Sequence, residues 1–174
     1  MEPPGRAIDA SIEFFRAGWR CVAPGPSADR WAGICAVSWV VDASIAVKWV
    51  IPEVLSDEAD RVSDGEADVL APDLLLVEVA NALWKKTAAK EISPREADAA
   101  FDLVRRSGID LRPTVPLLPR ATDMARRLGH PVYDCVYLAL AEREDTAFVT
   151  ADHRLLRRLS ARKLDVSIVD LRTL

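Results

Sequence analysis

Two aspartates directly follow short apolar stretches that are typical of buried β-strands. Asp42 comes after Val-Ser-Trp-Val-Val, and Asp152 comes after Ala-Phe-Val-Thr-Ala. Ligands of open parallel sheets bind outside the carboxyl ends of the strands, so both acids are candidates for one binding or catalytic site. The alternative is that each aspartate only caps the helix that follows it, because aspartate is a favoured N-cap residue.

A third aspartate, Asp134, lies in a helical segment that is apolar on nearly every side. Its neighbours on the same helix face are Tyr137, Leu138 and Ala141. A carboxylate in these surroundings is expected either near the start of the helix, beside free backbone N–H groups, or buried beside a cation.

Glu78 is the fourth candidate acid. With Asn81 and Lys85 it forms the polar stripe of a helix that is otherwise apolar. This stripe is either an ordinary solvent-facing surface, or it directs one carboxylate and one amide into a cleft.

Four carboxylates in one cleft would repel one another unless a cation lay between them. Ligand sets made only of oxygen atoms favour a hard cation, Mg²⁺ or Mn²⁺. The sequence contains two histidines and three cysteines, without the spacing that is typical of a zinc site. We expect His130 and His153 to be surface residues or neighbours of the ligands rather than ligands.

The pattern of apolar and polar residues predicts the elements that position these acids. Short apolar stretches predict strands at 37–41, 68–71, 109–112, 147–150 and 166–169. Helical periodicity and capping residues predict helices at 44–51, 56–63, 72–90, 93–108, 116–128, 131–144 and 152–161. Pro72 is expected at the first position of the 72–90 helix. The alternation predicts an α/β fold, a three-layer α/β/α sandwich with a central, mostly parallel sheet.

The composition changes near residue 37. Residues 1–37 hold four of the seven glycines and four of the eleven prolines, and their charges cancel. We interpret them as a loosely ordered N-terminal extension of an α/β domain at 38–174. Two alternatives are initiation of translation at Val37, and a helix in the extension that docks on the core through its aromatic side chains.

The composition also excludes several classes of protein. The 23 Lys and Arg and the 27 Asp and Glu give a net charge of −4, too mild for a polybasic nucleic-acid binder. Attraction to phosphate therefore has to be local or carried by bound cations. No apolar run approaches the ~20 residues that span a bilayer, and the N-terminus lacks the pattern of a secretory signal. The three unevenly spaced cysteines favour a reducing, cytoplasmic location.

Four fragments carry a resemblance to a known family. They are Val-Val-Asp42-Ala-Ser-Ile-Ala-Val-Lys-Trp, Ala-Pro-Asp-Leu-Leu-Leu-Val-Glu78-Val-Ala-Asn81-Ala-Leu, His-Pro-Val-Tyr-Asp134-Cys-Val-Tyr-Leu-Ala-Leu-Ala-Glu and Val-Thr150-Ala-Asp152. Together they resemble the PIN-domain ribonucleases, and most of all the VapC-type toxins of prokaryotic toxin–antitoxin pairs. Each fragment alone is weak evidence for the family, but four fragments in this order form a specific match. Residues 1–37 have no counterpart in the family pattern.

The resemblance implies that Asp42, Glu78, Asp134 and Asp152 form an acidic quartet around a metal ion. It implies direct metal ligation by Asp42 and Asp134, and ligation by Glu78 and Asp152 either directly or through water. Supporting polar positions are implied at Ser44, Asn81 and Thr150. The implied reaction is hydrolysis of an RNA phosphodiester by a metal-activated water, which leaves a 5′-phosphate and a 3′-hydroxyl.

The expected partners follow from the same resemblance. They are an RNA substrate, with tRNA or rRNA fitting the family, a second copy of the chain in a homodimer, and a cognate antitoxin whose C-terminal segment fills the cleft. Spacing places Arg154, Arg157 and Arg158 on one helix face, where they either bind the RNA backbone or form a solvated surface. Lys48 and Lys85 are further candidates for RNA binding. Trp49 and Trp84 are expected in the core, and the alternative is that they contribute to an interface with a partner.

Two alternatives remain for the function. The first is a PIN-fold module that binds RNA or a protein without cutting. The second is a phosphotransfer enzyme of the haloacid-dehalogenase type, which also places an aspartate after its first strand. That chemistry needs a second acid two residues later, where this sequence has Ser44.

Overall fold

The computed structural model describes residues 38–63, 67–159 and 165–174, and the predicted extension at 1–37 lies outside these residues. The strands are β1 (Ser38–Val41), β2 (Asp68–Pro72), β3 (Asp110–Arg112), β4 (Ala147–Thr150) and β5 (Ile168–Asp170). They form one five-stranded sheet in the order β3-β2-β1-β4-β5. Every neighbouring pair in it is parallel.

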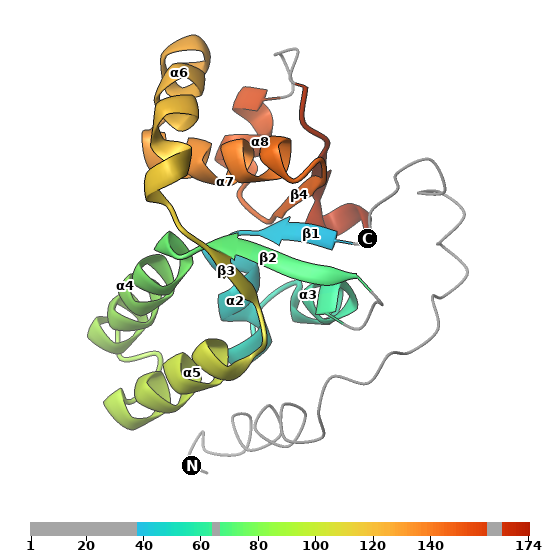
Figure 1. Cartoon of the computed structure of the whole chain (residues 1–174). Helices are drawn as coiled ribbons and strands as arrows, with labels where there is room; N and C mark the ends of the chain where they lie inside the picture. Colours follow the sequence, from blue (N-terminus) through green and yellow to red (C-terminus); the bar gives the residue numbers. More distant parts are fainter. Residues whose placement is uncertain (1–37, 64–66, 160–164) are drawn as a thin grey trace.

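Helices cover both faces of this sheet (Figure 1). One face carries α2 (Ala43–Val50), α3 (Ser56–Ser63), α4 (Leu74–Ala88) and α5 (Pro94–Arg106). The other face carries α6 (Leu118–Leu128), α7 (Val132–Arg143) and α8 (His153–Leu159). Two short 3₁₀ helices, Val115–Leu117 and Leu171–Thr173, complete the described elements. The predicted three-layer α/β/α sandwich is confirmed.

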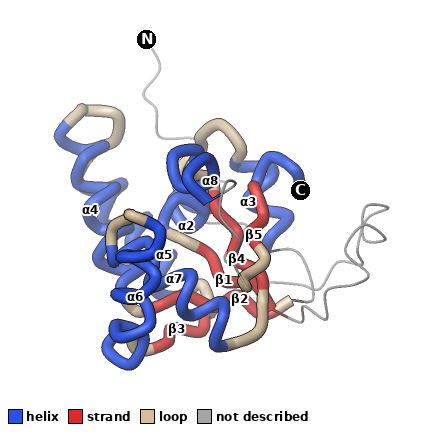
Figure 2. Tube along the Cα trace, turned by 90° about the horizontal axis from the view of Figure 1, so that it is seen from above, coloured by secondary structure: helices blue, strands red, loops and turns tan. Residues whose placement is uncertain are grey.

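The core lies around β4 and α7. All four residues of β4 are buried. Every side chain of α7 from Cys135 to Ala141 is buried as well, because this helix lies over the sheet, against β1, β2 and β4 (Figure 2). A helix that is apolar all round belongs in the interior. The sequence pattern of this segment therefore has a structural reason, and its one early acid, Asp134, needs a separate explanation.

Several predicted boundaries are confirmed. Ser93 and Glu96 form a reciprocal capping box at the start of α5. Gly129 ends α6 in the left-handed conformation, with φ of 61°, which glycine adopts without a steric penalty. The helix predicted at 152–161 is present as α8, and its last predicted residues lie outside the described part of the chain.

The predicted starts of the 72–90 helix and of the last strand are wrong. Pro72 does not open a helix but is the last residue of β2, where it pairs with Arg112 of β3. The adjacent Asp73 is the N-cap residue of α4, and its backbone N–H bonds the carbonyl of Arg112 at 2.8 Å, so the parallel pairing extends the strand through the proline. The last strand begins at Ile168 rather than at 166, because Ile168 is the residue in register with Phe148 of β4.

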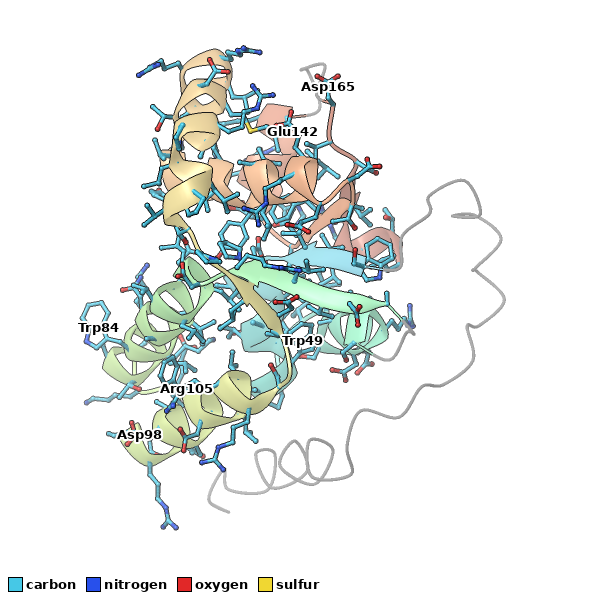
Figure 3. All side chains as sticks on the ribbon, viewed as in Figure 1. Trp49, Trp84, Asp98, Arg105, Glu142 and Asp165 are labelled. Carbon is cyan, nitrogen blue, oxygen red and sulfur yellow. The ribbon has the colours of Figure 1, made fainter. Side chains whose placement is uncertain are left out.

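The two tryptophans expected in the core differ. Trp49 is 4% exposed, and its indole N–H donates to the carbonyl of Ala59 at 2.8 Å. Trp84 is 64% exposed and projects from the outer side of α4 (Figure 3). The expectation for Trp84 is wrong because its neighbour Leu83 faces the core, and consecutive side chains on a helix point about 100° apart. Among the described residues, no helix is long and apolar enough to cross a membrane.

Candidate active site

Asp42 lies at the carboxyl end of β1, the central strand, and is almost completely buried. Its Oδ1 accepts hydrogen bonds from the backbone N–H of Ser44 (2.9 Å) and of Ile45 (3.2 Å), so it caps α2. The same oxygen accepts from Ser44 Oγ, and Oδ2 accepts from Thr150 Oγ1, both at 2.5 Å. The capping role is therefore real, and two hydroxyl groups bind the carboxylate in addition.

Thr150 and Ser44 join the ends of β1 and β4. Thr150 Oγ1 accepts from the backbone N–H of Asp152 at 3.0 Å, and Ser44 Oγ accepts from the N–H of Ala151 at 3.2 Å. Asp152 in turn caps α8, because its Oδ1 accepts from the N–H groups of Arg154 (2.7 Å) and Leu155 (3.3 Å). The two aspartates after the two strands thus belong to one hydrogen-bonded group.

Glu78 extends from α4 toward the same place and meets a tyrosine of α7. Tyr137 is 1% exposed, and its hydroxyl donates to Glu78 Oε2 at 2.6 Å. The Tyr137 ring stacks on Phe148 of β4, with ring centroids 5.9 Å apart. Burial and the neighbouring carboxylates raise the pKa of Tyr137 far above its usual range, so the hydroxyl keeps its proton.

Asp134 lies in the first turn of α7, and its partner is a histidine. His130 Nε2 is 2.6 Å from Asp134 Oδ2, and the histidine side chain is 7% exposed. His130 thus lies beside Asp134, whereas His153 is exposed on α8. Nδ1 of His130 is buried without a hydrogen-bond partner among the described residues.

One cleft brings all four acids together. It has a volume of about 460 Å³. It is lined by Asp42, Ala43, Ser44, Glu78, Asn81, Ala82, Lys85, Tyr133, Asp134, Tyr137, Phe148, Asp152 and Leu155. The polar stripe of α4 therefore faces a cleft rather than open solvent alone. The cleft lies outside the carboxyl ends of β1 and β4, where the strand order reverses, which is where open parallel sheets bind ligands.

The pKa values of the acids respond to this crowding. Burial raises the pKa of Asp42, and the hydrogen bonds from Ser44 and Thr150 oppose the increase. Burial also raises the pKa of Glu78 and Asp134. The charges of Asp42 and Asp134 add to the increase at Glu78, and the charge of Asp152 adds to it at Asp134. The charges of neighbouring acids therefore add to the effect of burial at Glu78 and at Asp134.

The described residues contain no group of three or more His, Cys, Asp or Glu side chains placed to share one metal ion. Each carboxylate has its own neighbours: hydroxyl groups donate to Asp42 and Glu78, backbone N–H groups donate to Asp152, and the His130 imidazole lies 2.6 Å from Asp134. The carboxylate oxygens of the cleft still fit Mg²⁺, because this ion is usually held by only one or two carboxylates and keeps several waters.

The basic residues near the cleft come from two helices. Lys85 of α4 lines the cleft and is exposed. Arg154, Arg157 and Arg158 are exposed on α8, which starts at the cleft residue Asp152. Arg158 also donates to the carbonyl of Gly129 at 3.0 Å and so connects α8 to the turn before α7. Lys48 pairs with Glu53 at 2.9 Å and is not a cleft residue.

Tyr137 is the site residue whose role sequence reasoning missed. Its spacing of three from Asp134 places it on the same helix face. That signal is weak, because buried tyrosines in apolar helices are common, and the partner Glu78 is 59 residues away in the chain.

Comparisons with known proteins identify the family of the chain. Residues 39–161 match the family profile of the PIN domain. Ribonuclease VapC3 of Pyrobaculum aerophilum is 30% identical over 124 residues, which cover 70% of this chain and 95% of that protein. Ribonuclease VapC1 of Mycobacterium tuberculosis is 40% identical over 87 residues, 49% of this chain and 63% of that protein.

The fold has a solved counterpart. The crystal structure of PAE2754 from Pyrobaculum aerophilum superimposes with a TM-score of 0.60 at 24% identity, over 81% of this chain and 94% of that one. The chain therefore belongs to the PIN-domain family and, within it, to the VapC-type members. The resemblance carried by the four sequence fragments is confirmed.

Proposed function

We propose that the protein is a metal-dependent endoribonuclease whose active site is the acidic quartet. The observation that carries this proposal is the meeting of four carboxylates in one cleft, where three of them have, among the described residues, only neutral hydroxyl or backbone N–H partners. Such donors orient a carboxylate but do not cancel its charge, which leaves the cleft able to attract a cation. The relatives named as VapC ribonucleases support the same activity.

The residues present fit Mg²⁺ or Mn²⁺. Asp42 and Asp134 would bind the ion directly, and Glu78 and Asp152 directly or through water. When bound, the cation supplies activation of a water molecule and neutralises the charge that develops on the phosphoryl oxygens. Hard carboxylate oxygens prefer these ions to softer metals.

The remaining chemistry belongs to side chains of the cleft. Glu78 or Asp152 would orient the attacking water and accept its proton, since both line the cleft. Asn81 and Lys85 lie one and two turns from Glu78 on α4, where an amide and an ammonium group can contact the phosphate. In-line attack by water then leaves a 5′-phosphate and a 3′-hydroxyl without a covalent protein intermediate.

The activity is tested by incubating the purified full chain with total tRNA and rRNA in Mg²⁺, in Mn²⁺ and in EDTA. We expect cleavage with either metal, no cleavage in EDTA, and 5′-phosphate ends on the products. Glu78→Gln should bind RNA but not cut it. If the wild type binds RNA tightly and never cuts it, the non-catalytic binding module becomes the better description.

The RNA itself is proposed to be a single-stranded loop of tRNA or rRNA, because unpaired bases are accessible to a shallow protein cleft. Lys85 and the three arginines of α8 are the proposed contacts to its backbone. Their positive charge is local, which agrees with an overall net charge of only −4.

The biological role is proposed to be that of a toxin held inactive by a cognate antitoxin. A basic side chain of such a partner, inserted in the cleft, would compensate the carboxylates as a cation does. Expression of the chain alone should arrest growth, and co-expression with the cognate antitoxin should restore it. Normal growth on expression of active enzyme alone would contradict the toxin role.

A homodimer is proposed through one apolar face. Val77 of α4, Val115 and Leu118 are 66%, 74% and 39% exposed. Thr114 Oγ1 accepts from the N–H of Leu74 at 3.3 Å, so the start of α4 adjoins the 115–118 segment. Sedimentation should show a dimer for the wild type and a monomer for Val77→Glu. A monomeric wild type would contradict this interface.

A further inference from the structure

We propose that Tyr137 is a positioning residue of the nuclease site, whose hydroxyl fixes Glu78 so that one carboxylate oxygen stays available to the cation or the attacking water. This inference rests on the proposed function and extends it to a residue outside the acidic quartet. Its basis is the 2.6 Å hydrogen bond from the Tyr137 hydroxyl to Glu78 Oε2, formed by two side chains that both line the cleft.

The hydrogen bond makes the two carboxylate oxygens of Glu78 different. Oε2 accepts from Tyr137, whereas Oε1 has no protein donor among residues 38–63, 67–159 and 165–174. A glutamate side chain has three rotatable bonds and loses rotamer freedom when it is held. A carboxylate that is already fixed at one oxygen presents the other in a defined place, which lowers the cost of binding a ligand there.

The tyrosine is held more firmly than the glutamate it orients. Its side chain is 1% exposed, and its ring stacks on Phe148 at 5.9 Å with an interplanar angle of 26°. Phe148 is fully buried in β4 and is in register with Val40 of β1. Two residues beyond this pair along the strands lie Asp42 and Thr150, which are hydrogen-bonded to each other at 2.5 Å. The hydroxyl of Tyr137 therefore has a fixed position relative to Asp42.

The chemical nature of the donor matters as much as its position. A lysine or arginine at this place would orient Glu78 but would also neutralise it and compete with the cation. A phenol donates one hydrogen bond and carries no charge at neutral pH. Neighbours that orient metal ligands in this way change metal affinity or activity about 10–100-fold when they are removed.

Tyr137→Phe tests the inference, because it removes the hydroxyl and keeps the stacked ring. Tyr133→Phe is the matched control. Tyr133 is the other of the two tyrosines in the chain and lies on the same helix. Its ring is 53% exposed at the cleft, and its hydroxyl has no hydrogen bond within the described residues.

Three measurements are made on the folded full chain. Calorimetric titration with Mn²⁺ gives cation affinity, and cleavage of an RNA that the wild type cuts gives kcat and KM. NMR of chains labelled at the tyrosine Cζ atom gives two signals, one for each tyrosine. We expect Tyr137→Phe to weaken Mn²⁺ binding and lower kcat by about 10-fold, with KM changed less than about twofold. Tyr133→Phe should leave the Mn²⁺ affinity at the wild-type value, because the Tyr133 hydroxyl donates to no carboxylate of the quartet within the described residues.

The Glu78→Gln background completes the test. There, Tyr137→Phe should change Mn²⁺ affinity by less than about twofold, because the two residues act as one unit. Glu78→Gln should also shift the Cζ signal of Tyr137 and leave that of Tyr133 in place. Wild-type cleavage together with an unchanged Mn²⁺ affinity and kcat in Tyr137→Phe would overturn this inference alone. Absence of both cleavage and Mn²⁺ binding in the wild type would overturn the proposed function, and this inference with it.

Discussion

Asp42 shows how one residue can satisfy a structural and a chemical requirement together. It caps α2 through backbone N–H groups and also accepts hydrogen bonds from Ser44 and Thr150. Sequence reasoning treats capping and site chemistry as competing roles, but a carboxylate has about four acceptor positions and can serve both. Asp152 repeats the arrangement at β4, since it caps α8 and lines the cleft.

The Thr150 hydroxyl is expected to stabilise the charged form of Asp42. Thr150→Val keeps the shape of the side chain and removes the 2.5 Å hydrogen bond to the buried Asp42 carboxylate. Loss of one partner of a buried acceptor costs about 1–3 kcal/mol. Because the removed donor stabilised the anion, the pKa of Asp42 in the folded state rises further. The loss in free energy of unfolding relative to the wild type should therefore grow as pH increases.

Urea unfolding in EDTA at pH 5 and at pH 8 measures this difference. Thr122→Val on α6 is the control, because no hydrogen bond of its hydroxyl occurs in the described part of the chain. If Thr150→Val lowers the free energy of unfolding by the same amount at both pH values, the hydroxyl does not favour ionised over protonated Asp42.

At the scale of elements, the site depends on the order of the strands. β1 lies between β2 and β4, so Asp42 comes next to Thr150 although they are 108 residues apart in the chain. The first half of the described chain forms β1, β2 and β3, and its helices α2 to α5 lie on one face of the sheet. The helices α6 and α7, which precede β4, lie on the other face. Glu78 and Asp134 thus approach the carboxyl ends of the central strands from opposite helical layers.

The sequence predicts these elements well and their contacts poorly. Apolar runs and caps are local signals, which is why the sequence predicts β1, β4 and the start of α5. The end of β2 at Pro72 depends on pairing with β3, and the exposure of Trp84 depends on where α4 is covered. Likewise, the contact between Tyr137 and Glu78 is set by packing between α4 and α7 across the cleft, which no local pattern contains.

The arginine face of α8 is expected to bind RNA phosphates. Replacement of Arg154, Arg157 and Arg158 by Ala should weaken RNA binding and reduce the slope of log K against log salt by about 0.7 for each phosphate that the variant no longer binds. The matched control replaces Arg95, Arg105 and Arg106 of α5, which lies on the opposite face of the sheet. Fluorescence anisotropy at several salt concentrations measures the slope. Equal slopes for both triple variants would place the RNA path elsewhere.

At the scale of the whole molecule, the described domain contains every residue of the proposed site. The match to the PIN family begins at residue 39, and β1 begins at Ser38. A chain that begins at Val37 is therefore expected to fold and to cut RNA like the full chain. Circular dichroism, thermal melts and cleavage assays on both chains check this prediction. Loss of soluble protein on truncation would show that residues 1–37 are needed by the core.

The acidic quartet also affects the stability of the entire fold. The folded-state pKa values of Asp42, Glu78 and Asp134 are raised above their usual values. When the pKa of an acid is higher in the folded state, the folded protein holds more protons than the unfolded chain at pH values between the two pKa values. The free energy of unfolding without metal should then fall as pH increases from about 4 through the raised values. A bound cation should reverse this loss.

The most direct test of the account is a set of thermal melts of the wild type and Asp134→Asn at pH 8, in EDTA and in excess Mg²⁺. Asparagine keeps the shape of the side chain and removes one charge from the cluster. We expect the variant to be at least as stable as the wild type in EDTA, to gain little from Mg²⁺ and to cut no RNA, whereas the wild type gains stability from Mg²⁺. A variant clearly less stable than the wild type in EDTA would contradict the account and would make Asp134 a structural partner of His130.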